Sequence, residues 1–111
     1  MKRLLSVYFL LTFCFNSYAQ RIFSVEYASQ ADINIFVADY ESQADLLVYR
    51  VKYQSQVGKN DGSWFFVEYA SNADKKIYYV EYKSQADVVI YFVDYPSKAK
   101  WRKNQKKHLF Y

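Results

Sequence analysis

The sequence predicts a small all-β domain built from about six strand units of 13 residues each. Three observations predict this fold. A tyrosine recurs six times at spacings of 13, 13, 16, 13 and 13 residues, the residues before each tyrosine alternate between two faces, and the residues after it are polar. With 22% aromatic residues among 111, the chain is too rich in apolar side chains to be disordered. Its length restricts it to one domain, and its single cysteine excludes a disulfide-stabilised mini-protein.

The N-terminus has the organisation of a cleavable signal peptide, which we assign to residues 1–19. Two basic residues precede the apolar run 4–15, and small residues lead to Ala19. Cleavage after Ala19 would leave a secreted or periplasmic domain, residues 20–111, without a transmembrane segment. The alternatives are an uncleaved anchor, for which the apolar run is shorter than the roughly 20 residues needed, and a lipoprotein attached through Cys14.

Each repeat reads aromatic–x–Val–acid–Tyr–x–Ser–Gln–Ala–Asp, followed by residues that are usually apolar. The six tyrosines are Tyr27, Tyr40, Tyr53, Tyr69, Tyr82 and Tyr95. In the copy at residues 88–95, odd-numbered residues share one face and even-numbered residues the other. The odd-numbered face varies least from copy to copy, so we expect it to form the core and the even-numbered face to be partly wet.

We expect strands of about eight residues, or about 26 Å at ~3.3 Å per residue. The polar segment Ser-Gln-Ala-Asp between them predicts turns in which serine and aspartate bond nearby backbone groups. Because this segment contains no glycine, the sequence disfavours a plain meander closed by two-residue hairpins.

The third repeat departs from the others. Residues 56–63 carry a three-residue insertion and both glycines of the chain. We expect a longer loop that lets the chain change direction midway and divides three units from three. The alternative is a binding loop, because irregular insertions often carry function.

The C-terminal tail is basic. Six positive charges and no acid lie between Lys98 and Lys107, whereas residues 21–97 hold seven basic and 11 acidic residues. We expect the tail to contact the acidic body or remain solvated, with an anionic cell surface as a candidate partner and nucleic acid not expected. The last three residues, Leu109–Tyr111, are expected to begin a truncated seventh strand.

The sequence gives little support for catalysis or metal binding. His108 is the only histidine and lies in the tail, so Ser-His-Asp, Cys-His and histidine-rich metal arrangements are not expected. Carboxylates recur with the repeat, whereas an active site needs one special place. We therefore predict no catalytic residue, no cofactor and no metal. The alternatives are an acid pair used in hydrolysis and calcium bound by ladders of acids, although the spacing of an EF-hand loop is absent.

Aromatic side chains are the candidates for residues that bind a small ligand. Phe66, Tyr79 and Phe92 lie on the even-numbered face and could form a flat platform for sugars; the alternative is that they cover the second face of a small core. Trp64 and Trp101 are further candidates, although closing the ends of the core is the favoured interpretation of these two.

Several motifs resemble one known family. The repeats Tyr40–Asp45 and Tyr82–Asp87, the sequence Trp64-Phe65-Phe66 after the long loop, and the ending Lys107–Tyr111 resemble the 7(1) septoil knot domain family. The resemblance extends from about Phe23 to the C-terminus. It implies a compact β-rich domain whose backbone is threaded into a seven-crossing torus knot, in small bacterial proteins without an assigned activity. It implies no catalytic or binding residues.

Periodicity alone does not predict a knot, because threaded chains are rare; a sandwich, a prism or a solenoid would fit the repeats equally well. A knot would suit a small domain without disulfides, since threading can give kinetic resistance to unfolding.

These observations predict a non-enzymatic, secreted structural or interaction module, which we expect to be a monomer. The alternative is a self-assembling extracellular fibre subunit, because the repeated Ser-Gln-x-Asp strands also resemble those of curlin-type proteins and stacked identical strands favour cross-β ladders. Charges on every unit and the scarcity of glycine argue against a fibre. A hydrolase that uses an acid pair ranks last.

Overall fold

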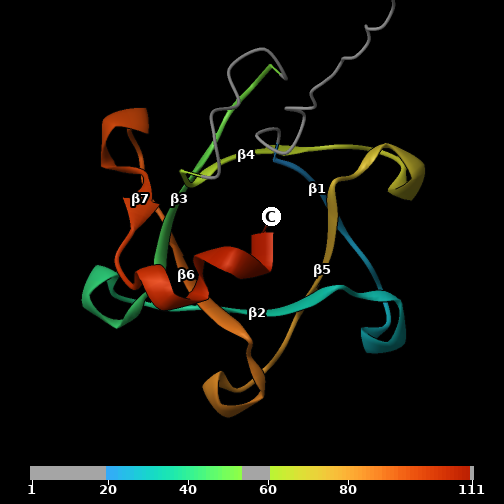
Figure 1. Ribbon diagram of the computed structural model, residues 1–111, viewed down its shortest axis with the longest axis horizontal. Coiled ribbons are helices and arrows are strands. Elements are labelled where there is room, and N and C mark those ends of the chain that lie inside the picture. Colours follow the sequence, from blue (N-terminus) through green and yellow to red (C-terminus); the bar gives the residue numbers. More distant parts are fainter. Residues whose placement is uncertain (1–19, 54–60, 111) are drawn as a thin grey trace, which may run out of the picture.

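Six parallel strands close into a barrel in the computed structural model, which describes residues 20–53 and 61–110. The strands are β1 (Arg21–Ser24), β2 (Ile33–Val37), β3 (Leu46–Arg50), β4 (Ser63–Phe66), β5 (Lys75–Tyr79) and β6 (Val88–Phe92). Their order is β4-β1-β5-β2-β6-β3, and the pairing of β3 with β4 closes the ring (Figure 1). A short strand, β7 (Lys100–Trp101), pairs antiparallel with the start of β3. The predicted all-β repeat domain is confirmed.

The two halves of the chain alternate around the barrel. Each of the six parallel pairings joins one strand of the group β1–β3 to one strand of the group β4–β6. Consecutive strands within a half therefore skip one place, while β3 and β4 are neighbours. This single step coincides with the insertion in the third repeat and divides three units from three. Residues 54–60 of that insertion lie outside the described residues.

Each described loop that joins strands which are not neighbours crosses the strand that lies between them. After β1, the N–H of Val25 donates to the carbonyl of Ile77, and before β2 the N–H of Asp32 donates to the carbonyl of Lys76, both at 2.8 Å. Successive carbonyls of a strand point to opposite sides, so the loop between Val25 and Asp32 passes across β5. The rejected meander of hairpins is thus absent among the described strands.

A 3-10 helix occupies the middle of each described loop of this kind and projects outward from the ring (Figure 1). These helices are η3 (Ala28–Gln30), η4 (Glu41–Gln43), η6 (Ala70–Asn72), η7 (Lys83–Gln85) and η8 (Pro96–Lys98). The prediction of polar turns is confirmed. The expected strand length of eight residues is wrong. Each of the strands β1–β6 has only four or five residues, after which the chain leaves the barrel.

Equivalent positions of the six repeats form rings around the barrel axis. Neighbouring strands are offset by two residues in the repeat. For example, Ile22 lies five residues before Tyr27, and it pairs with Lys75, which lies seven residues before Tyr82. Because all six interfaces share this offset, the total shear is twelve residues and the repeats are related by one rotation. The central ring is fully buried and consists of Ile22, Ile35, Val48, Trp64, Ile77 and Ile90.

The prediction of the core face is wrong. Val88 and Ile90, on the even-numbered face, are 0% exposed inside the barrel, whereas Tyr95 on the odd-numbered face is 64% exposed. The tyrosine is retained in every repeat where the strand has ended and the 3-10 helix begins, so its retention does not reflect burial in the core. Val93, also on the odd-numbered face, belongs to a smaller buried cluster with Ala44 and Leu47 outside the barrel.

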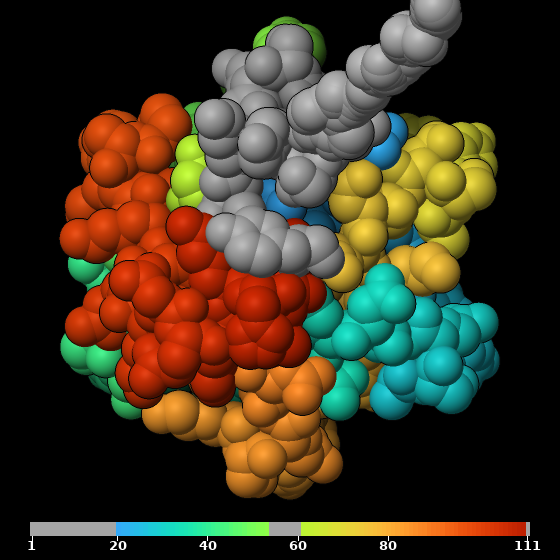
Figure 2. All heavy atoms as spheres, in the orientation of Figure 1, coloured from blue at the N-terminus to red at the C-terminus, as the bar shows by residue number. Residues whose placement is uncertain are grey.

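The C-terminal segment fills one end of the barrel. It forms the 3-10 helix η9 (Asn104–Phe110), so the expected seventh strand is wrong for Leu109 and Phe110, while Tyr111 lies outside the described residues. Phe110 is 1% exposed, and its ring centroid lies 5.4 Å from that of Trp64. The segment lies at the centre of the ring in Figure 1 and covers the middle of the face seen in Figure 2.

Within residues 20–53 and 61–110, no helix has the length and apolar character that a membrane span requires.

Candidate binding site at the barrel mouth

The carboxyl ends of the six strands form an open mouth opposite η9. The position three residues before each tyrosine contributes one side chain to this ring. In order around the barrel these are Phe66, Ser24, Tyr79, Val37, Phe92 and Arg50. In parallel barrels this end commonly carries function, because the loops that follow the strands converge there.

Arg50 lies between two aromatic rings at the mouth. Its guanidinium carbon lies 4.3 Å from the ring centroid of Phe66 and 5.5 Å from that of Phe92. Both rings come from strands that neighbour β3, as the ring order requires. Burial raises the pKa of Tyr79, across the ring, while the positive charge of Arg50 acts in the opposite direction. The mouth is therefore a cation set among aromatic rings.

The five predicted aromatic residues do not form one surface. Phe66, Tyr79 and Phe92 gather at the mouth, but Phe66 and Phe92 are half-buried against the core and flank Arg50 rather than presenting a flat platform. Trp64 is 0% exposed inside the barrel and cannot contact a ligand in this structure. Trp101 is half-buried at the other end, with its ring centroid 5.8 Å from that of Phe110. Both tryptophans thus pack in or around the core.

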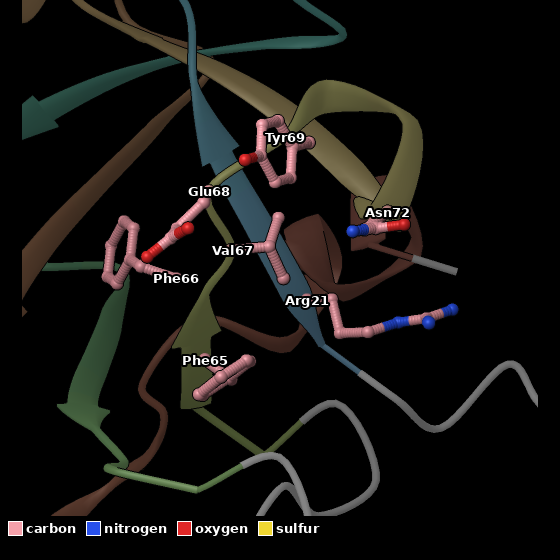
Figure 3. A pocket seen from close by; sticks show the side chains of 7 residues that line it. All are labelled: Arg21, Phe65, Phe66, Val67, Glu68, Tyr69 and Asn72. Atoms are coloured by element: carbon pink, nitrogen blue, oxygen red, sulfur yellow. The ribbon is translucent and has the colours of Figure 1, made fainter.

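Two surface hollows lie beside the mouth at equivalent positions of consecutive repeats. The first, of about 490 Å³, is lined by Arg21, Phe65, Phe66, Val67, Glu68, Tyr69 and Asn72 (Figure 3). The second, of about 680 Å³, is lined by Ala28, Asn34, Tyr78, Tyr79, Val80, Glu81 and Gln85. Six lining positions are shared by the two sets, namely four successive residues at the strand end, one on the 3-10 helix and one on the crossed strand.

The repeated tyrosines lie at the surface of the loops, and one of them, Tyr69, lines the first hollow. All six are between 63% and 66% exposed, and each precedes a polar loop. The five 3-10 helices η3, η4, η6, η7 and η8 each begin directly after one of these tyrosines, and that tyrosine has an extended conformation. The chain therefore carries a regular set of exposed aromatic rings that its own core does not use.

The aspartates that end the repeats fasten the loops to the barrel. The N–H of Asp32 donates to the carbonyl of Lys76, and the carboxylate of Asp32 accepts the N–H of Lys76 at 2.9 Å. The same reciprocal contact joins Asp45 to Val89, and carboxylate contacts of 2.8 Å recur at Arg21 and Asn34. These aspartates are Asp32, Asp45, Asp74 and Asp87. Sequence analysis expected carboxylates in the turns, and the structure assigns these four a backbone contact.

Asp45 also binds the basic tail. Its carboxylate is buried and lies 3.1 Å from the Nζ of Lys106 and 3.6 Å from that of Lys103. Burial alone would raise the pKa of Asp45, but the N–H of Val89 and the two lysines bring it below its ordinary value. The guanidinium of Arg102 donates to three carbonyls at and beside η4. At least three of the tail's six cations therefore bind the domain itself.

The described residues contain no cluster of three or more histidine, cysteine, aspartate or glutamate side chains that could hold a metal ion. Arg50 was not among the residues that the sequence predicted for a binding site. A usable signal was present, because arginine is the only charged residue among the six equivalent positions.

These features define a class of repeat protein in which interleaved strands close one parallel barrel. The chain belongs to the 7(1) septoil knot domain family, whose model matches residues 19–102. The ending at 107–111, part of the resemblance noted above, lies beyond that match. The same comparisons found no similar protein among curated sequences and no similar chain among solved structures.

Proposed function

We propose that the protein is a non-enzymatic, secreted interaction module that presents repeated binding features on a closed, monomeric barrel. The observation that carries this proposal is the set of six tyrosines, each about two-thirds exposed and each at the same place in its repeat. Large aromatic side chains at regular exposed positions are typical of contact surfaces, because they bury much area at little entropic cost.

The use of the carboxylates supports a role other than catalysis. Asp32, Asp45, Asp74 and Asp87 accept backbone N–H groups of the strands that their loops cross. A carboxylate whose oxygen is occupied by a backbone N–H donor suits a structural bond better than proton transfer.

The pairing of the strands supports a monomer rather than the alternative, a fibre subunit. Growth of a cross-β fibre needs strands with an unpaired edge. Each of the strands β1–β6 is paired on both sides within the chain. The interleaved winding is also compatible with the knotted path that the family resemblance implies, which would slow unfolding without disulfides.

Export rests on the signal peptide expected at residues 1–19. A contact between the tail and an anionic cell surface is a further element of the proposal, supported by the exposed side chains of Lys98 and Lys100. It is limited by the self-contacts of Arg102, Lys103 and Lys106.

The test is expression of the full chain in a bacterial host, followed by fractionation, mass spectrometry and light scattering on a size-exclusion column. We expect a periplasmic or extracellular protein that begins at Gln20 and elutes as a monodisperse monomer. A variant with Leu10→Arg and Leu11→Arg should remain in the cytoplasm, because its apolar run is interrupted. Retention of the unaltered chain in the cytoplasm, or thioflavin-binding fibres, would contradict the proposal.

A further inference from the structure

The two halves of the chain depend on each other for every strand pairing that the structure describes. Each of the seven pairings joins a strand of residues 20–53, the first half, to a strand of residues 61–110, the second half. Figure 1 shows the result as blue-to-green strands that alternate with yellow-to-red ones around the ring. Within the described residues, neither half pairs two of its own strands.

Polar contacts of the side chains follow the same division. Three ion pairs join the first half to the second, namely Arg21–Asp74, Asp45–Lys103 and Asp45–Lys106. The backbone contacts of the repeated aspartates also do so, at Asp32, Asp45, Asp74 and Asp87. At the closed end of the barrel, the side chain of Gln20 donates to the carbonyl of Phe110 at 3.3 Å. The halves therefore meet through one extensive and specific interface.

The core is shared between the halves as well. In the central buried ring, residues of the first half alternate with residues of the second; the ring runs Trp64, Ile22, Ile77, Ile35, Ile90 and Val48. A half without its partner would expose these apolar side chains together with both edges of its strands. Exposed apolar surface and unpaired strand edges are the two features that drive chains to associate.

A single stretch of backbone, residues 51–62, links β3 of the first half to β4 of the second. The contacts described above do not require that both halves belong to one molecule. The second half of another copy offers the same strands, the same ion-pair partners and the same apolar side chains. A barrel built from two copies would keep the strand pairings of the monomer.

We propose that a second copy of this chain is a binding partner, and that two copies assemble during folding by exchanging their halves. Each barrel of this exchanged dimer contains the first half of one copy and the second half of the other. The candidate binding mouth is then composite, because Arg50 comes from one copy and the rings of Phe66 and Phe92 come from the other. The inference goes beyond the proposed function and does not depend on export or on a ligand.

Concentration during folding decides between the monomer and the exchanged dimer. A half that is tethered by a short connection meets its own partner half at an effective concentration of roughly 1 mM. Chains that fold at about 10 µM therefore close on themselves, in keeping with the proposed monomer, whereas at about 1 mM other copies compete on equal terms. Once formed, either species persists, because a barrel must lose its strand pairings before its halves can separate.

The test is complementation between two variants of the mature chain that cannot fold alone. Ile35→Asp disables the first half and Ile90→Asp the second, because both side chains are 0% exposed in the central ring and a charge there would be buried without a partner. When the two variants are unfolded in urea, mixed and diluted together, the unaltered first half of one and the unaltered second half of the other can build one intact barrel. We expect a dimer by light scattering. We also expect half of the fluorescence change of normal folding, because only one copy contributes Trp64 to an intact barrel.

Ile22→Asp mixed with Ile35→Asp is the matched control. Both substitutions lie in the first half and replace fully buried residues of the same ring, so no combination of halves is intact. This pair should give neither the dimer nor the fluorescence change. Failure of the first pair to recover, or equal recovery of the control pair, would overturn the inference.

The unaltered chain provides a second measurement, which needs no disabled variant. Refolding ¹⁵N-labelled and unlabelled chains together at about 1 mM should give a dimer that contains one chain of each kind in native mass spectrometry, whereas refolding at about 10 µM should give monomer. Chains that are mixed after folding should form no such dimer. Monomer alone at both concentrations would overturn this inference and leave the proposed function intact, whereas fibres or cytoplasmic retention of the exported chain would refute the proposed function.

Discussion

Replacing Asp45 by alanine should destabilise the barrel by about 3 kcal/mol. The substitution leaves the N–H of Val89 buried without its 2.9 Å acceptor, which costs about 1–3 kcal/mol. It also removes the partner of Lys106 and Lys103, whose side chains are 37% and 59% exposed, so each contact adds less than about 1 kcal/mol. Equilibrium unfolding in urea, followed by tryptophan fluorescence, measures the loss.

Asp87→Ala provides the matched comparison. Its carboxylate accepts the N–H of Asn34 at 2.8 Å in the same geometry, but this contact is exposed and has no lysine beside it. Water can replace the carboxylate, so we expect a loss of about 1 kcal/mol. Equal losses for the two variants would refute the reasoning that burial and the tail contacts distinguish Asp45.

The remaining predictions concern acid, backbone, core and mouth. Because the pKa of Asp45 lies below its ordinary value of 3.8, its stabilisation is present above that pH and is lost as the pH falls further, so the stability difference between the unaltered protein and Asp45→Asn should shrink as the pH is lowered below 3.8 in urea titrations. Gly62→Ala should cost about 3 kcal/mol or more by thermal unfolding, because Gly62 has φ +96° and a Cβ would meet the carbonyl oxygen of Leu47; a neutral result would contradict that close approach. Phe110→Ala should lower the free energy of unfolding by about 3–5 kcal/mol and alter the fluorescence of Trp64; an unchanged stability would contradict the packing of Phe110 in the core. Arg50→Gln should cost about 0.5–1 kcal/mol in urea through lost contacts with two aromatic rings, and a stabilised variant would show that the cation strains the mouth.

The repeat predicted the class of fold but not its topology. Spacing of the tyrosines and the polar Ser-Gln-Ala-Asp segments correctly indicated six strand units joined by turns. Sequence could not show that consecutive strands skip a place, because pairing partners are chosen by barrel closure and not by local residues. The sequence also predicted the wrong core face, because the positions that vary least between repeats are not the buried ones. Tyr95 is retained at the start of a loop, whereas Ile90 and Trp64 are different residues at equivalent positions of the buried ring.

The candidate site was only partly predictable. The sequence correctly placed three aromatic residues on one face of their strands, namely Phe66, Tyr79 and Phe92. They gather at one end of the barrel because all strands share the same offset. Arg50 is the only charged residue at its repeat position, but the sequence does not show that two aromatic rings flank it. The hollows could not be foreseen, since each includes a residue from the crossed strand, more than 40 positions away along the sequence in the case of Arg21.

The alternation of the two halves has a consequence for how the chain is made. No strand of β1–β3 pairs with another of that group, so no part of the sheet can form on the ribosome until residues 63 onward have emerged. Until then the first half cannot form sheet, and every parallel pairing except that of β3 with β4 must then join residues more than 40 positions apart, which slows folding. A gene that encoded only three repeats could complete the barrel only by intertwining two copies, so the present chain has the arrangement of such a dimer joined end to end.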